Sequence, residues 1–226
     1  MYMIKISASL MCANWLRLED EVKALEGAGT DVLHLDIMDG SFVPNFAINF
    51  WQVESIRKAT KLPLEAHMMT YEPIRYVHRI AELGIDSIYV HAESCKDLES
   101  TIREIKDHGK KAGIALNVET PTAVLFDYLD TLDGVLFMAT RPGFTGQKFR
   151  PEIIPKISNF RKMAKSNGLK LDLIADGHIG KDTIPELAKS GINAFVGGTT
   201  GLFIPNVAYK ENIKSMKALA EKYYSW

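Results

Sequence analysis

Short apolar segments rich in β-branched residues alternate along the chain with longer segments in which apolar residues recur every three or four positions. The short segments are typical of strands, and the longer ones of helices that bury one face. Eight strands are predicted, at residues 4–7, 32–36, 62–67, 87–91, 111–116, 134–138, 170–175 and 193–196. Helices are predicted between them, among others at residues 17–28, 73–83, 98–108, 151–166 and 182–190.

The predicted strands are nearly continuous apolar runs, which is the pattern of a parallel sheet covered by helices. Eight strand–helix units within 226 residues favour a closed (β/α)8 barrel, the TIM barrel of the α/β class, over an open sheet. No G-x-G-x-x-G motif follows the first strand, which argues against a dinucleotide-binding fold. The sequence contains no linker or low-complexity segment, so we expect residues 1–226 to form a single barrel domain.

Charge and composition argue against several classes of function. The 27 Lys and Arg residues nearly balance 28 Asp and Glu residues and are scattered, which does not predict a nucleic acid partner. No apolar run approaches the roughly 20 residues of a membrane-spanning helix, and the first residues do not resemble a secretion signal. We therefore expect a cytoplasmic protein without a membrane partner, and we also expect a homo-oligomer.

Cys12 and Cys95 form no C-x-x-C pair, so neither a disulfide framework nor a cysteine-rich zinc site is predicted.

Polar residues end or follow three of the predicted strands. His34 and Asp36 lie on the second strand, His67 ends the third, and Asp176 follows the seventh. Catalytic groups of such barrels gather at the C-terminal strand ends, and residues i and i+2 of a strand point to the same side, so these side chains can meet above the barrel axis. Two imidazoles and two carboxylates suit Zn²⁺, Mn²⁺ or Fe²⁺ without selecting among them. The sequence therefore predicts one divalent metal ion at these four residues.

His91 also ends a predicted strand. A single histidine in that position is more often structural than a metal ligand, and no carboxylate at the same strand end is an obvious partner for it. We therefore expect His91 to have a structural or supporting role.

Glycine-rich turns follow the last three predicted strands, at residues 141–147, 176–178 and 197–201. The loops after strands seven and eight commonly bind phosphate in such barrels, because backbone N–H groups can approach an anion closely at glycines. The loop at 141–147 contains two glycines and can close over a ligand. Each turn alone also suits plain barrel geometry, but together they predict a phosphate site.

Three segments carry a resemblance to a known family: His34-Leu-Asp-Ile-Met-Asp-Gly-Ser-Phe-Val-Pro-Asn45, His67-Met-Met69 and Arg141-Pro-Gly-Phe-Thr-Gly-Gln147. With them the chain resembles the ribulose-phosphate 3-epimerase family from about Lys5 to Phe203. The resemblance implies an isomerase that inverts carbon 3 of a phosphorylated ketose through a cis-enediolate. It also implies that His34, Asp36, His67 and Asp176 hold the metal and that Asp36 and Asp176 double as the acid/base pair.

The resemblance further implies which residues contact the substrate. These are Ser9, His67, the methionines Met38, Met69 and Met138 around the reaction centre, and Gly143, Gly146, Gly177, Gly198 and Thr199 toward the phosphate. Methionine also fills irregular gaps in ordinary cores, so packing is the alternative role for the three methionines.

Within the family, the segments 9–12, 116–121 and 198–203 look more like D-allulose-6-phosphate 3-epimerases. The expected reaction is therefore the conversion of D-allulose 6-phosphate to D-fructose 6-phosphate, and the alternative is ribulose-5-phosphate 3-epimerase. A barrel that binds sugar phosphate without catalysis, and a lyase or decarboxylase on the same fold, are further alternatives. Ala8, Arg141 and His178 depart from the usual family residues, and the last two leave the length of the sugar open.

Overall fold

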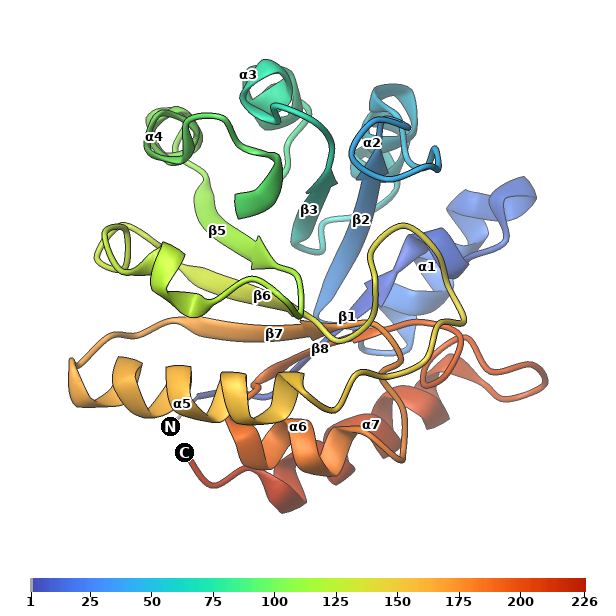
Figure 1. The fold of residues 1–226 in the computed structure, drawn as a ribbon. Coiled ribbons are helices and arrows are strands. Elements are labelled where there is room, and N and C mark those ends of the chain that lie inside the picture. Colours follow the sequence, from blue (N-terminus) through green and yellow to red (C-terminus); the bar gives the residue numbers. More distant parts are fainter. Residues whose placement is uncertain (1) are drawn as a thin grey trace.

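Eight parallel strands form a closed barrel in the computed structural model, which describes residues 2–226. Figure 1 shows the strands in the middle and the helices around them. In chain order the strands are β1 (Lys5–Ser9), β2 (Val32–Met38), β3 (Leu64–Met69), β4 (Ser87–His91), β5 (Lys111–Leu116), β6 (Gly134–Met138), β7 (Asp172–Asp176) and β8 (Ala194–Gly197). Each strand pairs with the next, and β8 pairs with β1 to close the ring. The predicted TIM barrel of the α/β class is confirmed.

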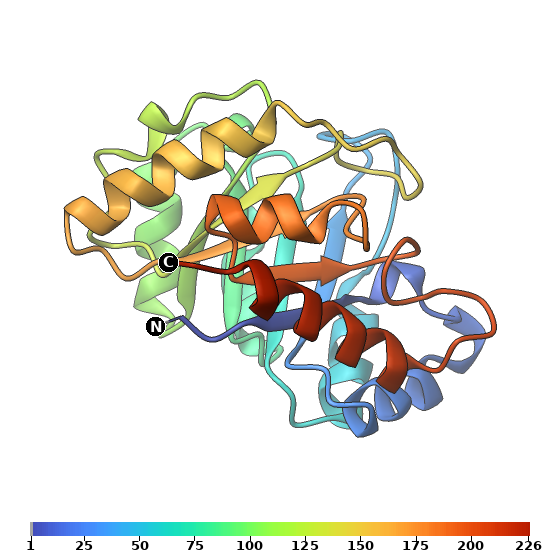
Figure 2. The ribbon, with the colours of Figure 1, turned by 90° about the horizontal axis from the view of Figure 1, so that it is seen from below.

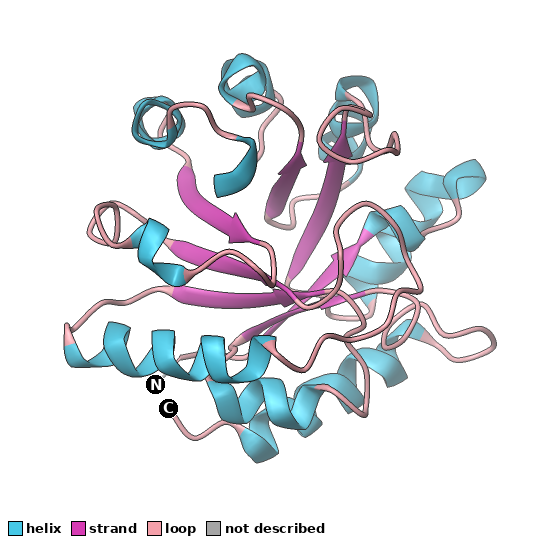
Figure 3. Cartoon of the chain, viewed as in Figure 1, coloured by secondary structure: helices cyan, strands magenta, loops and turns pink. Residues whose placement is uncertain are grey.

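The helices pack on the outside of the barrel, as the cyan segments of Figure 3 show. They are α1 (Leu18–Gly27), α2 (Phe50–Ala59), α3 (Ile74–Glu82), α4 (Leu98–Asp107), α5 (Ile153–Ser166), α6 (Ile184–Ser190) and α7 (Tyr209–Tyr223). Seen from below in Figure 2, α5, α6 and α7 lie side by side. Within the described residues, no helix combines the length and the apolar character that crossing a membrane would require.

One connection of the helical layer differs from the strict strand–helix repeat predicted from the sequence. The connection between β5 and β6 holds only a 3-10 helix at Thr122–Leu125, whose Leu125 is fully buried against the barrel. The helix between β2 and β3, α2, agrees with the predicted repeat, although its range was not among those named. Its start is fixed by a capping box, in which Asn49 and Gln52 each accept a hydrogen bond from the other's backbone N–H.

The strands that carry the polar residues continue further than predicted. β2 ends at Met38 and β3 at Met69, and these two residues lie opposite each other in the parallel ladder. The interpretation of His67 as the last residue of its strand is therefore wrong by two residues, because the buried ladder continues through both methionines. Asp176 does end β7.

Side chains of β2 alternate between the helical layer and the barrel interior. Leu33, Leu35 and Ile37 belong to the large apolar core beneath the helices. The residues between them face the interior, where the floor is an apolar cluster of Tyr89, Ala115, Leu136, Met138, Ile174, Ala194 and Val196. Polar groups at the C-terminal strand ends therefore stand on a water-excluding floor.

Candidate active site

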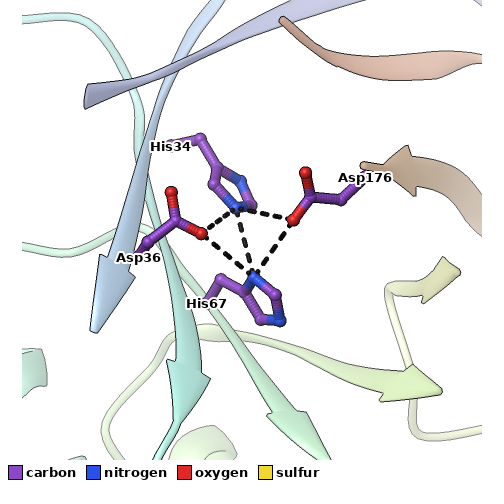
Figure 4. Close-up of side chains that lie close together, drawn as sticks. All are labelled: His34, Asp36, His67 and Asp176. Carbon is purple, nitrogen blue, oxygen red and sulfur yellow. Dashed lines mark hydrogen bonds and ion pairs between the residues drawn. The ribbon is translucent and has the colours of Figure 1, made fainter. Parts of the chain in front are cut away.

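Four ionisable side chains from three strands meet at the C-terminal end of the barrel. β2 supplies His34 and Asp36, β3 supplies His67, and β7 supplies Asp176. One potential ligand atom from each lies within 4.8 Å of all the others, and Figure 4 shows the two imidazoles between the two carboxylates. Three of the four residues are buried and Asp176 is partly exposed.

The spacing of these atoms matches the shell of a small divalent ion. His67 Nδ1 lies 3.3 Å from Asp36 Oδ1 and 3.4 Å from both Asp176 Oδ2 and His34 Nε2. His34 Nε2 lies 3.4 Å from Asp36 Oδ1 and 3.8 Å from Asp176 Oδ2. Metal–ligand bonds of roughly 2.0–2.2 Å would place tetrahedral ligands about 3.3–3.6 Å apart. Four of the five separations lie in this range and the fifth, at 3.8 Å, is slightly longer, so the donor set and its spacing fit a metal ion.

Electrostatics inside the cluster favour added positive charge. Burial acts to lower the pKa of His34, but Asp36 and Glu65 outweigh it and raise this pKa well above its usual value. For His67 burial is likewise outweighed, by Asp176 and Asp36, and its pKa is raised. Burial acts to raise the pKa of Asp36, but the two histidines lower it well below its usual range. Without a metal ion, the buried carboxylates draw protons onto the imidazoles instead.

Protons and a metal ion compete for the same imidazole nitrogens, so metal affinity should fall as the pH is lowered. An imidazole must lose its proton before the same nitrogen can bind a metal, and the raised pKa values of His34 and His67 extend the competition above the usual histidine range. Each displaced proton should weaken binding by about tenfold per pH unit below those pKa values. Chelator competition with Zn²⁺ at pH 8, 7 and 6 measures this dependence, and an affinity that is constant over the range would contradict it.

A carboxylate beneath the cluster orients His34. Glu65 lies on β3 two residues before His67 and is buried, and its Oε1 lies 2.8 Å from His34 Nδ1. An ionised carboxylate only accepts hydrogen bonds, so His34 Nδ1 donates to Glu65, and once Nε2 has lost its own proton that nitrogen can present a lone pair to a metal ion. Glu65 was not among the predicted site residues, although the alternation along β3 places it on the same inner face as His67.

A second histidine–carboxylate pair lies beside His67. His91 at the end of β4 is fully buried, and its Nδ1 lies 3.0 Å from Glu93 Oε2. Burial lowers the pKa of His91 to about 4. Burial acts to raise the pKa of Glu93, but the hydrogen bond from His91 outweighs it and this pKa is lowered to about 2. The expectation that His91 has no carboxylate partner is therefore wrong, because the partner lies in the 3-10 turn after the strand.

Each aspartate of the cluster turns only one oxygen toward the imidazoles (Figure 4). Asp36 uses Oδ1 there, and its Oδ2 accepts a 2.7 Å hydrogen bond from the Ser9 hydroxyl. Asp176 uses Oδ2, and its side chain is the more exposed of the two carboxylates. Each group can therefore ligate an ion through one oxygen and hold or release a proton at the other.

A cavity opens above the cluster and brings together the remaining predicted residues. Beside Asp36 and Asp176 its lining includes Ser9, Met38, Met69, Met138, Gly143, Gly146, Gly177, Gly198 and Thr199. His67, which was also predicted to contact the substrate, is fully buried and is not part of this lining; it contacts Asp36 and Asp176, which are. Cys12, Arg141 and His178 line the same cavity and were not predicted to contact the ligand.

The loop after β6, yellow in Figure 1, lies over this cavity and is held on two sides. The Asn45 side chain donates a 2.7 Å hydrogen bond to the Gly143 carbonyl oxygen. On the other side, His178 Nδ1 lies 2.9 Å from the Gln147 carbonyl oxygen and donates to it. His178 adopts φ +54°, a conformation that is unfavourable for most residues and is stabilised here by this contact.

Comparison with known proteins places these observations in a family. A sequence model of the ribulose-phosphate 3 epimerase family matches residues 5–203. A ribulose-phosphate 3-epimerase of Bacillus subtilis is 44% identical, and the match covers 87% of this chain and 91% of that protein. One from Synechocystis is 40% identical over 91% and 90% of the two chains. The ribulose-5-phosphate-3-epimerase of Arabidopsis thaliana, described as chloroplastic, is 39% identical over 95% and 76%.

Solved structures with low sequence identity share the barrel. A structure of KGPDC from Streptococcus mutans superposes with a TM-score of 0.72 at 13% identity, covering 98% of this chain and 99% of that one. Phosphoribosyl anthranilate isomerase from Thermus thermophilus gives a TM-score of 0.67 at 15% identity, with 97% and 99% covered. At such identities the likeness shows the fold alone.

Proposed function

The chain belongs to the ribulose-phosphate 3-epimerase family, and from this membership we propose that it interconverts D-ribulose 5-phosphate and D-xylulose 5-phosphate. It is an isomerase, a ketose-phosphate 3-epimerase, like the relatives it matches. The observation that carries the proposal is the pair of aspartates on opposite sides of the four-residue cluster, both of which line one cavity.

Inverting carbon 3 of a 2-ketose requires one group to remove a proton and another to return one from the opposite face. We assign these roles to Asp36 and Asp176, which flank the imidazoles in Figure 4. One carboxylate takes the carbon-3 proton and the other, in its protonated form, donates to the opposite face of the cis-enediolate. The reverse reaction exchanges the roles, so the substrate epimer determines which aspartate acts as base. The Ser9 hydroxyl orients Asp36 for this step.

The proposed cofactor is one divalent ion held by His34, Asp36, His67 and Asp176, with Zn²⁺, Mn²⁺ and Fe²⁺ as the candidates. When bound, the ion supplies a Lewis acid that stabilises negative charge on the ketose oxygens. The three methionines of the lining, Met38, Met69 and Met138, would exclude water from the reacting carbon without competing for its proton.

We assign the phosphate to the turns after β6, β7 and β8, with Gly143, Gly146, Gly177, Gly198 and Thr199 as its contacts. All five line the cavity on the side of these loops. Gly177 has φ +102°, and a Cβ there would lie 2.3 Å from Thr140 Oγ1 and 2.9 Å from Thr140 N. Only glycine therefore fits this turn in its observed position.

Replacing Gly177 with alanine should raise KM for the sugar phosphate by about tenfold, because the turn must move away from Thr140 and its N–H groups lose their alignment. Steady-state kinetics of the metal-loaded variant measures the change. Gly168→Ala is the matched control, since Gly168 also has positive φ but lies beyond α5 with no atom within 4 Å of the added Cβ. A Gly177→Ala enzyme with unchanged KM would contradict the phosphate assignment.

The length of the sugar separates two candidate substrates. The relatives' names favour the pentulose phosphate over the D-allulose 6-phosphate expected from the sequence. D-allulose 6-phosphate remains the second candidate, because Cys12 and Thr199, from two of the segments that resemble the hexulose enzymes, line the cavity. Arg141 and His178 lie at the phosphate side of that cavity, where they would contact a longer or shorter ligand differently.

Deuterium exchange tests both the epimerase activity and the choice of substrate. The protein is loaded in turn with Zn²⁺, Mn²⁺ or Fe²⁺ and incubated in D₂O with D-ribulose 5-phosphate or D-allulose 6-phosphate. We expect deuterium at carbon 3 together with the epimer, and a higher kcat/KM for the pentulose. A higher kcat/KM for the hexulose would reverse the substrate assignment, and exchange with neither sugar would contradict the epimerase proposal.

Three further expectations from the sequence belong to the proposal. We propose that residues 1–226 act as one catalytic domain, that the protein assembles as a homo-oligomer, and that it works in the cytoplasm. Gel filtration with light scattering would test the assembly, and a monomer at micromolar concentration would contradict it.

A further inference from the structure

His91 makes a direct contact with a residue of the metal cluster. Its ring lies edge to edge with that of His67, with centroids 5.1 Å apart and an interplanar angle of 26°. The two Nε2 atoms are 2.9 Å apart, which is a hydrogen-bond distance between two ring nitrogens. Both rings are fully buried, so one of the two nitrogens must donate and the other must accept.

On the side away from His67, His91 contacts the carboxylate of Glu93, and both oxygens of this carboxylate accept hydrogen bonds. Glu93 Oε2 faces His91 Nδ1 at 3.0 Å. Glu93 Oε1 accepts from the Asn117 backbone N–H at 2.9 Å and from the Thr120 hydroxyl. A carboxylate held by these donors can only accept from the imidazole, so the proton of His91 lies on Nδ1.

The direction of the remaining hydrogen bond follows from this. With its proton on Nδ1, neutral His91 has a lone pair on Nε2 and accepts from His67 Nε2–H. In its neutral form, which metal binding requires, His67 then carries its proton on Nε2, and its Nδ1, which faces Asp36 Oδ1 and Asp176 Oδ2, has a lone pair for the ion. His34 has the corresponding arrangement, because Glu65 holds its Nδ1–H and leaves Nε2 for the cluster.

We propose that Glu93 and His91 are positioning residues that fix His67 in its Nε2–H tautomer and so present its Nδ1 to the metal ion. The proposal rests on the proposed function only in taking the cluster of His34, Asp36, His67 and Asp176 as a metal site. Each of the two imidazole ligands is then held by its own chain of hydrogen bonds that ends in a carboxylate. Such partners typically contribute 10–100-fold to metal affinity.

Replacing Glu93 with glutamine tests the direction of these hydrogen bonds and hardly changes the shape of the side chain. If the glutamine oxygen stays with Asn117 N–H and Thr120, its NH₂ faces His91 Nδ1, which must then accept. The proton of His91 moves to Nε2 and meets the Nε2–H of His67, which disfavours the tautomer that binds metal. We expect a loss of Zn²⁺ affinity of at least tenfold in chelator competition.

The matched control is Glu119→Gln, in the same loop as Asn117. Glu119 is exposed and pairs with Arg150, outside the hydrogen-bond chain, so its variant should bind Zn²⁺ like the wild type. His91→Gln keeps an acceptor for His67 and should retain more affinity than His91→Leu. Thermal unfolding of each metal-free variant identifies any that fail to fold.

Nitrogen-15 NMR of the histidines in the wild-type protein provides a readout that needs neither a variant nor a substrate. We expect His91 to carry its proton on Nδ1 and none on Nε2, in both the metal-free and the Zn²⁺-loaded protein. A proton on Nε2 of His91, or Zn²⁺ affinity of a folded Glu93→Gln variant equal to that of Glu119→Gln, would overturn the proposal. Loss of epimerase activity alone would bear on the proposed function and not on this tautomer.

Discussion

Replacing Asp176 with asparagine should lower kcat for epimerisation by about 10³-fold, because the variant keeps an oxygen for the cluster but can no longer accept or donate the proton at carbon 3. The remaining Asp36 can still remove a proton from the epimer that presents its hydrogen to that side. In D₂O one epimer should therefore gain deuterium at carbon 3 without conversion, while the other shows neither exchange nor conversion. Proton NMR of both sugars, each incubated with the variant at saturating metal, measures the two processes separately.

The control for this experiment lies on the same strand. Asp172 begins β7 at the opposite end of the barrel and pairs with Lys5, so Asp172→Asn should retain its kcat. Metal content must be measured for both variants, since Asp176 is also an assigned ligand. An Asp176→Asn enzyme that holds metal and converts both epimers at the wild-type rate would refute the role of Asp176 as an acid/base group.

The core of the site was predictable because it follows the two-residue period of a strand. His34 and Asp36 share the inner face of β2, and the parallel ladder places His67 directly opposite Asp36. The same rule places Glu65, two residues before His67, on that inner face, but Glu65 lies inside its strand and not at the strand end where catalytic groups are expected. Burial of a glutamate inside a strand is itself a signal, because such a charge requires a partner.

Other parts of the site depend on contacts that the two-residue repeat of a strand cannot predict. Glu93 reaches His91 only because the chain turns back in a 3-10 helix at Ala92–Ser94 after β4. The loop after β6 is held by Asn45 and His178, which lie far from it in the sequence. The start of α2 was not predicted for a different reason, since its Asn49–Gln52 capping box is a less familiar form of the Ser/Thr and Glu pattern.

The substrate could not be read from the fold or from the cluster, because both are common to epimerases of pentulose and hexulose phosphates. Chemistry at carbon 3 needs the same two aspartates whatever the length of the sugar. Discrimination must come from the cavity between the cluster and the phosphate turns, where Cys12, Arg141 and His178 lie. A difference of one hydroxymethylene group gives only modest selectivity unless a polar group recognises it, so kinetics must decide.

Removing the metal ion should abolish activity and lower the melting temperature by about 8–16 °C. The buried cluster gathers Asp36, Asp176 and Glu65 around two imidazoles, and without the ion their repulsion is relieved only by protonation. An ion present at 1,000 times its Kd contributes roughly 4 kcal/mol to the free energy of unfolding. For a chain of this length each kcal/mol corresponds to about 2–4 °C.

Calorimetry of the protein before and after dialysis against a chelator measures this shift, and adding back Zn²⁺, Mn²⁺ or Fe²⁺ separately tests which ion restores both stability and turnover. His34→Gln should melt at the same temperature with and without the ion, because it removes a ligand that is fully buried. His78→Gln is the matched control, since His78 lies exposed on α3 beside Glu82, and it should keep the full metal-dependent shift. A chelated wild-type protein that keeps both its melting temperature and its turnover would mean that the cluster is held by protons alone and that the two aspartates work without an ion.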